Sequence, residues 1–184
     1  MGSWGATTTD ESKPKFLTDA EKKDCFADNT GWTFPAGGNG NPNAQRETLV
    51  AIGDLTGRAS TTAGLGRGTI SSTRFITTTL GAAAGGSFSA EVIYNEAVDV
   101  TGTPQMTITN TPGSDVVLDY ASGTGTNRLT FTATVAGGAT AENDVLSIGA
   151  NSIALNSGTI KDAGTAVDSE ITHGAQTTTI TVGA

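Results

Sequence analysis

The chain has 184 residues, enough for one domain with a substantial extension or for two small domains. Glycine supplies 25 positions and threonine 33, and because glycine disfavours helices and threonine is β-branched, this composition predicts an all-β protein. The formal net charge is −8, and residues 87–184 hold only two basic residues against ten acidic ones. Nucleic acid and anionic lipid require clustered Lys and Arg, so we expect neither as a partner.

The beginning of the chain predicts one short helix. Residues 1–17 are polar, with Trp4 and Phe16 as isolated apolar side chains. Thr18 and Glu21 then have the spacing of a capping box, in which each side chain bonds to the other residue's amide. The acidic residues that come early and the lysines that follow favour a helix of two to three turns, ending near residues 28–31.

The first 34 residues contain five of the ten aromatic side chains but few other apolar groups. We therefore expect that this segment builds no core of its own and that its rings bury against this chain's sheets or against a partner. Aromatic residues are enriched at the centres of interfaces, which favours docking onto another subunit. The candidate docking residues are Trp4, Phe16, Leu17, Phe26, Trp32 and Phe34.

The middle of the chain is interpreted as a small β region. Residues 47–52 predict a strand with apolar side chains on both faces, and residues 73–80 predict another. Between them, residues 56–72 are interpreted as a connection or an edge strand. The Gly- and Ala-rich residues 81–86 are interpreted as a linker, which divides the chain into an N-terminal part, 1–86, and a C-terminal domain, 87–184.

The C-terminal part shows the clearest strand pattern. Phe88, Ala90, Val92 and Tyr94 alternate with mostly polar residues, which is typical of a strand with one buried face. Short strands at this spacing, separated by Gly-, Pro- and Asn-containing turns, predict an immunoglobulin-like Greek-key sandwich. The predicted strands are residues 87–95, 98–101, 105–110, 116–121, 128–136, 146–149, 152–155 and 177–182.

Few residues indicate catalysis. The single histidine, His173, lies near a predicted turn and is interpreted as a solvated residue. The chain lacks a Gly-x-Ser-x-Gly elbow, and nothing in the spacing selects a nucleophile, so we expect neither an enzyme nor a cofactor.

The single cysteine, Cys25, excludes an intrachain disulfide. It is interpreted as a small buried hydrophobe, with an interchain disulfide or a reactive thiol as the alternatives.

Acidic residues at predicted strand ends leave other chemistries open. Calcium prefers about six to eight oxygen ligands, but no Asp-x-Asp-x-Asp-Gly spacing occurs, so these acids are interpreted as solubilising. Paired carboxylates could also serve glycoside hydrolysis, although aromatic sugar platforms are lacking. Residues 64–68 resemble a phosphate loop without its Lys-Ser/Thr ending and are interpreted as a flexible connection. The acids considered are Glu96, Asp99, Asp115, Asp119, Glu142, Asp144 and Asp162.

Two groups of segments resemble known families. WGA at 4–6, DESKPK at 10–15, the helical segment 17–26, GW at 31–32 and ETLVAIGDL at 47–55 resemble virion structural proteins of marine tailed bacteriophages, notably cyanophages. NEAVDVTGTP at 95–104, YASGTG at 120–125 and LNSGTIKD at 155–162 are similar to bacterial immunoglobulin-like repeats in surface proteins of aquatic bacteria and their phages. Together they imply a virion component.

The leading prediction is therefore a non-enzymatic capsid decoration, or cement, protein. Its N-terminal half would dock on the major capsid protein or another virion subunit, or on a second copy, while the acidic sandwich projects outward. The chain has no apolar run of about 20 residues and no signal-peptide pattern at its start, so we expect assembly in the host cytoplasm. The alternative is a tail, fibre or surface adhesin module that binds host glycans through loop ends at 96–103, 122–127 and 162–165.

Overall fold

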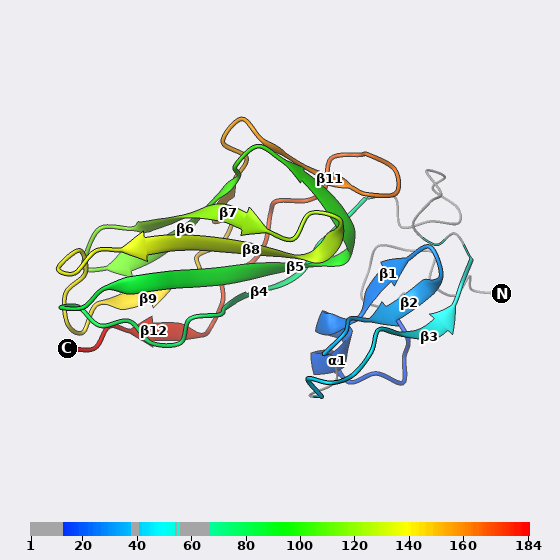
Figure 1. The fold of residues 1–184 in the computed structure, drawn as a ribbon, viewed down its shortest axis with the longest axis horizontal. Helices are drawn as coiled ribbons and strands as arrows, with labels where there is room; N and C mark the ends of the chain where they lie inside the picture. The colour runs from blue at the N-terminus through cyan, green and yellow to red at the C-terminus, as the bar shows by residue number, and fades with distance from the viewer. Residues whose placement is uncertain (1–12, 38–40, 54, 56–66) are drawn as a thin grey trace.

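The computed structural model describes residues 13–37, 41–53, 55 and 67–184 (Figure 1). Within these residues the chain is all-β, as predicted, with one helix of six residues and no helix that is long and apolar enough to cross a membrane. The elements are α1 (Asp19–Asp24), β1 (Phe26–Asp28), β2 (Gly31–Phe34), β3 (Glu47–Ala51), β4 (Ile70–Phe75), β5 (Gly86–Thr101), β6 (Gln105–Thr111), β7 (Val116–Ser122), β8 (Thr126–Val135), β9 (Val145–Ser147), β10 (Ile153–Ala154), β11 (Thr159–Asp162) and β12 (Thr179–Thr181).

The described residues between 13 and 55, called the N-terminal unit below, begin with the predicted capping box. The Thr18 amide donates to the Glu21 carboxylate at 2.8 Å, and the Glu21 amide donates to the Thr18 hydroxyl at 3.3 Å. The helix is shorter than predicted, because Cys25 is already extended and β1 begins at the next residue. At the start of β2, Gly31 has a φ of 137°, and a Cβ there would lie 2.0 Å from the Val50 carbonyl oxygen.

The N-terminal unit has a small core of its own, contrary to the expectation that its aromatic segment could build none. Trp32 is 1% exposed, and β1, β2 and β3 form an antiparallel sheet around it. β3 also differs from the prediction of two apolar faces, since only its central residues Leu49 and Val50 are half-buried. The buried side chains of this core are Leu17, Cys25, Ala27, Trp32, Phe34 and Leu55.

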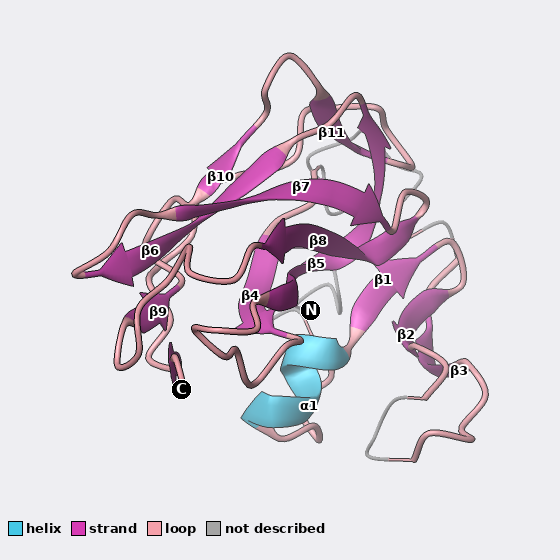
Figure 2. Cartoon of the chain, turned by 60° about the vertical axis from the view of Figure 1, so that its left-hand side comes forward, coloured by secondary structure: helices cyan, strands magenta, loops and turns pink. Residues whose placement is uncertain are grey.

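Residues 67–184 form the sandwich. β6, β7, β8 and β5 lie side by side in a Greek-key order, and β9 and β12 continue from the second half of β6 to cover the core (Figure 2). The predicted inward positions of β5 are confirmed, because Phe88, Ala90, Val92 and Tyr94 are all fully buried in this core. On the partner strand β8, Phe131 is buried and packs edge-on against Tyr120 at 6.0 Å between ring centroids.

The sandwich begins before the expected boundary at residue 86. β4 pairs antiparallel with β5, and the Phe75 ring lies 5.6 Å from that of Phe88. Gly81 and Gly85 form a bridge, so the segment expected to be a linker is a turn inside the sandwich. β11, which pairs with the end of β5, was not predicted. The connection expected at 56–72 lies outside the described residues up to residue 66.

Candidate functional site

The N-terminal unit joins the sandwich at an irregularity in β5. The register of β5 on β8 shifts between Ile93 and Val98, and the residues within the shift bond to other segments. The Asn95 side chain accepts a hydrogen bond at 2.7 Å from a backbone amide just before β4. Glu96 forms a parallel bridge with Ala27 of β1. The bulge therefore carries the attachment of the N-terminal sheet, as bulges that redirect a strand commonly do.

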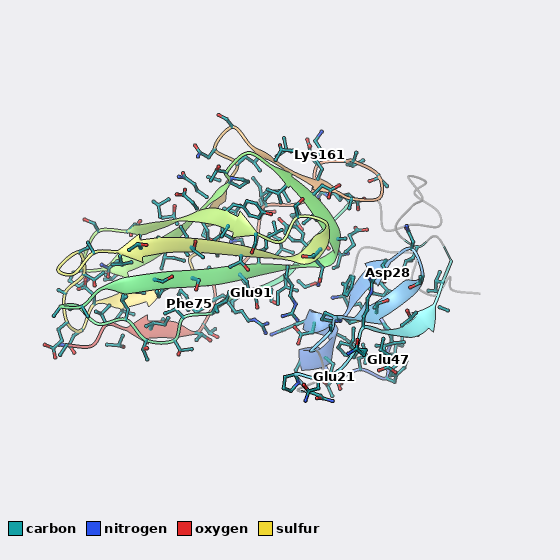
Figure 3. All side chains as sticks on the ribbon, viewed as in Figure 1. Glu21, Asp28, Glu47, Phe75, Glu91 and Lys161 are labelled. Atoms are coloured by element: carbon teal, nitrogen blue, oxygen red, sulfur yellow. The ribbon has the colours of Figure 1, made fainter. Side chains whose placement is uncertain are left out.

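Four charged side chains tie α1 to three strands of the sandwich. Asp24, at the end of α1, accepts a hydrogen bond from Arg128 of β8 at 2.9 Å and lies 3.9 Å from Arg74 of β4. Glu91 of β5, which is labelled in Figure 3, binds the same two arginines: it pairs directly with Arg74 and lies 3.8 Å from Arg128. The network contains two acids and two arginines, so its charges balance. The Glu91 side chain is 9% exposed and that of Asp24 29%, so the network is buried at Glu91 and partly solvent-exposed at Asp24.

A cleft of about 340 Å³ separates the two units beside this network. From the N-terminal unit it is lined by Phe26, Asp28, Pro35, Ala36 and Arg46, and from the sandwich by Ala97, Gly125, Thr126, Asn127 and Arg128. The Arg46 guanidinium lies 5.3 Å from the centre of the Phe26 ring and pairs with Asp28. A guanidinium therefore lies on each side of the cleft.

Asp28 organises the N-terminal wall of this cleft. Its Oδ1 accepts hydrogen bonds from the Thr30 and Gly31 amides at 2.6 and 3.1 Å, and its Oδ2 accepts one from the Thr33 hydroxyl at 2.9 Å. Burial alone would raise the pKa of Asp28, but hydrogen bonds from Thr30, Arg46 and Thr33 outweigh it and hold the pKa below its usual value. Asp28 is thus a structural anion that fixes the β1–β2 turn.

A second pair of acidic side chains is almost fully buried where β11 joins β5. Glu96 and Asp162 are each 1% exposed, and Asp162 lies opposite Val98 in the ladder, which makes the two carboxyl groups diagonal neighbours. Asp162 Oδ1 accepts from the Gly164 and Thr165 amides at 2.7 and 2.6 Å. Burial, and then the adjacent Asp162, raise the pKa of Glu96 to about 9.

Of the five candidate docking residues that the structure describes, one lies on the surface. Phe16 is 66% exposed, while Trp4 lies outside the described residues. The side chains of Leu17, Phe26, Trp32 and Phe34 are buried within this chain, where they do not form a free surface. The sequence pattern identified rings that need burial, and the core of the N-terminal unit itself buries Trp32 and Phe34, while Phe26 lies beneath Arg46 at the cleft.

Cys25 and His173 both have structural roles. Cys25 is completely buried, as predicted, and burial raises the pKa of its thiol to about 11, so it is protonated near neutral pH. His173 is not merely solvated: its Nε2 accepts from the Ser152 amide at 3.1 Å and lies 3.0 Å from the Ser152 hydroxyl. Its Nδ1 lies 2.8 Å from the Gly174 carbonyl oxygen, so both ring nitrogens contact neighbouring polar groups of the chain.

The other acids considered from the sequence are dispersed. Asp144 is buried and accepts a hydrogen bond at 2.9 Å from the Asn110 side chain, while Asp99, Asp115 and Asp119 are exposed, as is Glu142. No three His, Cys, Asp or Glu side chains of the described residues converge on one point. Of the loop that resembles a phosphate site, residues 64–66 lie outside the described part of the chain.

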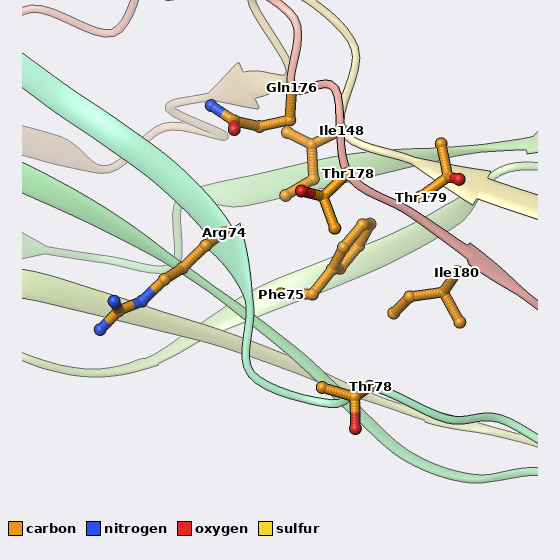
Figure 4. Close-up of a pocket in the computed structure, with 8 residues that line it drawn as sticks. All are labelled: Arg74, Phe75, Thr78, Ile148, Gln176, Thr178, Thr179 and Ile180. Carbon is orange, nitrogen blue, oxygen red and sulfur yellow. The ribbon is translucent and has the colours of Figure 1, made fainter. Parts of the chain in front are cut away.

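A smaller pocket of about 170 Å³ lies at the open side of the sandwich core (Figure 4). Phe75 of β4 faces Ile148 and Ile180 across it, and Arg74, Thr78, Gln176, Thr178 and Thr179 complete its lining. The pocket is a mainly apolar gap between β4 and the stretch that leads into β12.

The fold defines an all-β protein in which a Greek-key sandwich carries a small N-terminal unit on one bulged strand. No protein-family model matches the chain, and neither a curated protein nor a solved structure matches it significantly.

Proposed function

We propose that this chain is a non-enzymatic virion structural protein, and more specifically a capsid decoration protein of a tailed bacteriophage. The N-terminal unit docks on the capsid lattice, through the major capsid protein or another virion subunit, and the sandwich projects from the particle. The resemblance of the N-terminal segments to marine phage virion proteins supplies the kind of partner, and the capsid exterior is the location that follows.

The observation that carries the proposal is the asymmetry of the molecule along its length. The N-terminal unit lies at one end, and the C-terminus lies at the opposite end of the sandwich (Figure 1). Residues 1–66 carry six basic and eight acidic residues, whereas the sandwich, residues 67–184, carries four and ten. A nearly neutral end tolerates crowding on a lattice, and acidic ends repel one another in solution, which keeps neighbouring copies apart.

The test uses the full chain, because β1 and β5 are hydrogen-bonded and a deletion would disturb both units. Phe16→Asp places a charge on the exposed ring of the N-terminal unit, and Val117→Asp is the matched control on the sandwich, where Val117 is 47% exposed. Phage heads that lack the protein are incubated with each variant, and the bound copies per head are counted by gel densitometry. We expect Phe16→Asp to weaken binding at least about tenfold, equivalent to roughly 1.4 kcal/mol, and Val117→Asp to bind as the wild type. Equal occupancy for both variants would contradict docking through the N-terminal unit.

The cleft between the two units favours a second candidate, a tail, fibre or surface adhesin module for host glycans. The Arg46 side chain lines this cleft and is 56% exposed, so its guanidinium offers hydrogen-bond donors to hydroxyl or carboxylate groups of a sugar. The Phe26 ring is covered by Arg46, so the cleft offers donors rather than an aromatic platform. Binding of the wild type to a glycan array, lost in Arg46→Gln, would support this candidate over the decoration protein.

A further inference from the structure

The Glu96–Asp162 pair poses an electrostatic problem that the protein must solve. Both side chains are 1% exposed, and they are diagonal neighbours across β5 and β11. Two negative charges at this separation in a buried site would repel strongly and lose their hydration. A positive charge, either a proton or a cation, must therefore lie between the two carboxyl groups.

The hydrogen bonds around the pair point to a cation. Asp162 Oδ1 is engaged by two backbone amides, which fixes the orientation of that carboxylate. Asp162 Oδ2 and both oxygens of Glu96 accept no hydrogen bond from any residue that the structure describes, although all three atoms are buried. Buried carboxylate oxygens are almost always satisfied, so three unsatisfied oxygens on two neighbouring acids indicate a missing ligand that accepts electron pairs. One shared proton would engage only two of them.

A small pocket lies next to the two acids along the chain. A pocket of about 130 Å³ opens beside the pair and is lined by Ala97 and Ala163, which follow the two acids in the chain, together with Asp28, Asn29 and Gly164. The Ala163 amide donates to the Ala97 carbonyl at 3.1 Å, which holds these two segments together at the pocket wall. A space of this size holds several water molecules, and its wall includes the residue that follows each acid.

We propose that Glu96 and Asp162 bind a divalent cation, Ca²⁺ in preference to Mg²⁺. Glu96 supplies both carboxylate oxygens and Asp162 supplies Oδ2, and water or neutral oxygens provide the rest of about six to eight ligands. Ca²⁺ accepts a bidentate carboxylate and an irregular shell, whereas Mg²⁺ demands a near-ideal octahedron. Glu96 lies on β5 and Asp162 on β11, so the ion links these two strands at the bulge to which the N-terminal unit is attached.

The test measures the thermal unfolding of the full chain, first stripped with EDTA and then titrated with CaCl2 or MgCl2 at neutral pH. We expect millimolar CaCl2 to raise the wild-type Tm by about 5 to 10 °C when it exceeds the Kd roughly a hundredfold, with a smaller effect of MgCl2. Glu96→Gln and Asp162→Asn keep the side-chain shape and should abolish the shift. Asp99→Asn, an exposed acid on the same strand, should keep it.

Isothermal titration of the EDTA-stripped wild type with CaCl2 measures binding directly, so the result does not depend on how well each variant folds. Saturable binding that is lost in Glu96→Gln supports the site. The absence of binding heat and of any Tm shift in the wild type would overturn it and leave the pair with a shared proton. A calcium shift that persists in both Glu96→Gln and Asp162→Asn would overturn it as well, because the ion would then bind elsewhere.

Discussion

In the four-charge network that ties α1 to the sandwich, substitutions of Asp24 and Glu91 should differ in their effect on the free energy of unfolding, although both acids bind the same two arginines. Glu91→Gln removes a charge whose side chain is 9% exposed, and Asp24→Asn removes one that is 29% exposed. The loss of one partner of a fully buried ion pair costs about 3–5 kcal/mol, but Arg74 is 49% exposed and can regain water. We therefore expect Glu91→Gln to cost about 1–2 kcal/mol, and Asp24→Asn no more than about 0.5–1 kcal/mol.

Urea unfolding at neutral pH measures both costs, and the double variant completes a cycle. Both acids share Arg74 and Arg128. The loss of unfolding free energy in the double variant should therefore differ from the sum of the two single losses by at least about 0.5 kcal/mol. High salt should reduce the cost of Asp24→Asn more than that of Glu91→Gln, since exposed charges are screened more effectively. If Asp24→Asn proves the costlier change, or if the two costs simply add, the network does not act as described.

Three further predictions concern the N-terminal unit. Cys25 should not react with Ellman's reagent in the native state, because burial raises the pKa of its thiol to about 11, and should react fully in denaturant. The pKa of Asp28 is lower in the folded than in the unfolded state. The ionised carboxylate therefore adds to the free energy of unfolding above the usual Asp pKa, and this contribution is lost as the pH falls through the folded-state pKa. Asp28→Asn should accordingly make Tm less dependent on pH in the acid range. Trp32→Ala should cost about 3–5 kcal/mol in urea unfolding, while Phe16→Ala, at an exposed ring, should cost almost nothing.

The elements that the sequence predicted best are those specified by local patterns. The capping box at Thr18 and the alternation from Phe88 to Tyr94 are both present in the structure, because neighbouring residues alone determine them. β11 was missed because its four residues show too little alternation and form a strand only by pairing with the distant end of β5. The core around Trp32 was missed for a similar reason, since Leu49, Val50 and Leu55 reach it from a later part of the chain.

The buried acid pair was assigned to solvated loops, yet one signal in the sequence could have identified half of it. Tyr94 and Val98 occupy inward positions of β5, and Glu96 lies midway between them with the same parity. An acid at an inward position of a strand needs a proton, a partner of opposite charge or a cation. Asp162 carries no such signal, because its burial depends on the pairing of β11 with β5. A sequence pattern could therefore identify one acid of the proposed site, which two distant strands assemble.

The junction joins the two cores mainly through polar contacts. Its links are the four-charge network, one bridge from β1 to β5, and Lys13, which is 3% exposed and donates to the Ser71 hydroxyl at 3.0 Å. Interfaces of this polar kind permit relative motion of the joined parts, unlike large apolar ones. Glu96 both pairs with β1 and belongs to the proposed cation site, so an ion bound there would stiffen the bulge from which the N-terminal unit extends. Calcium would then control how rigidly the sandwich projects from whatever surface holds the N-terminal unit.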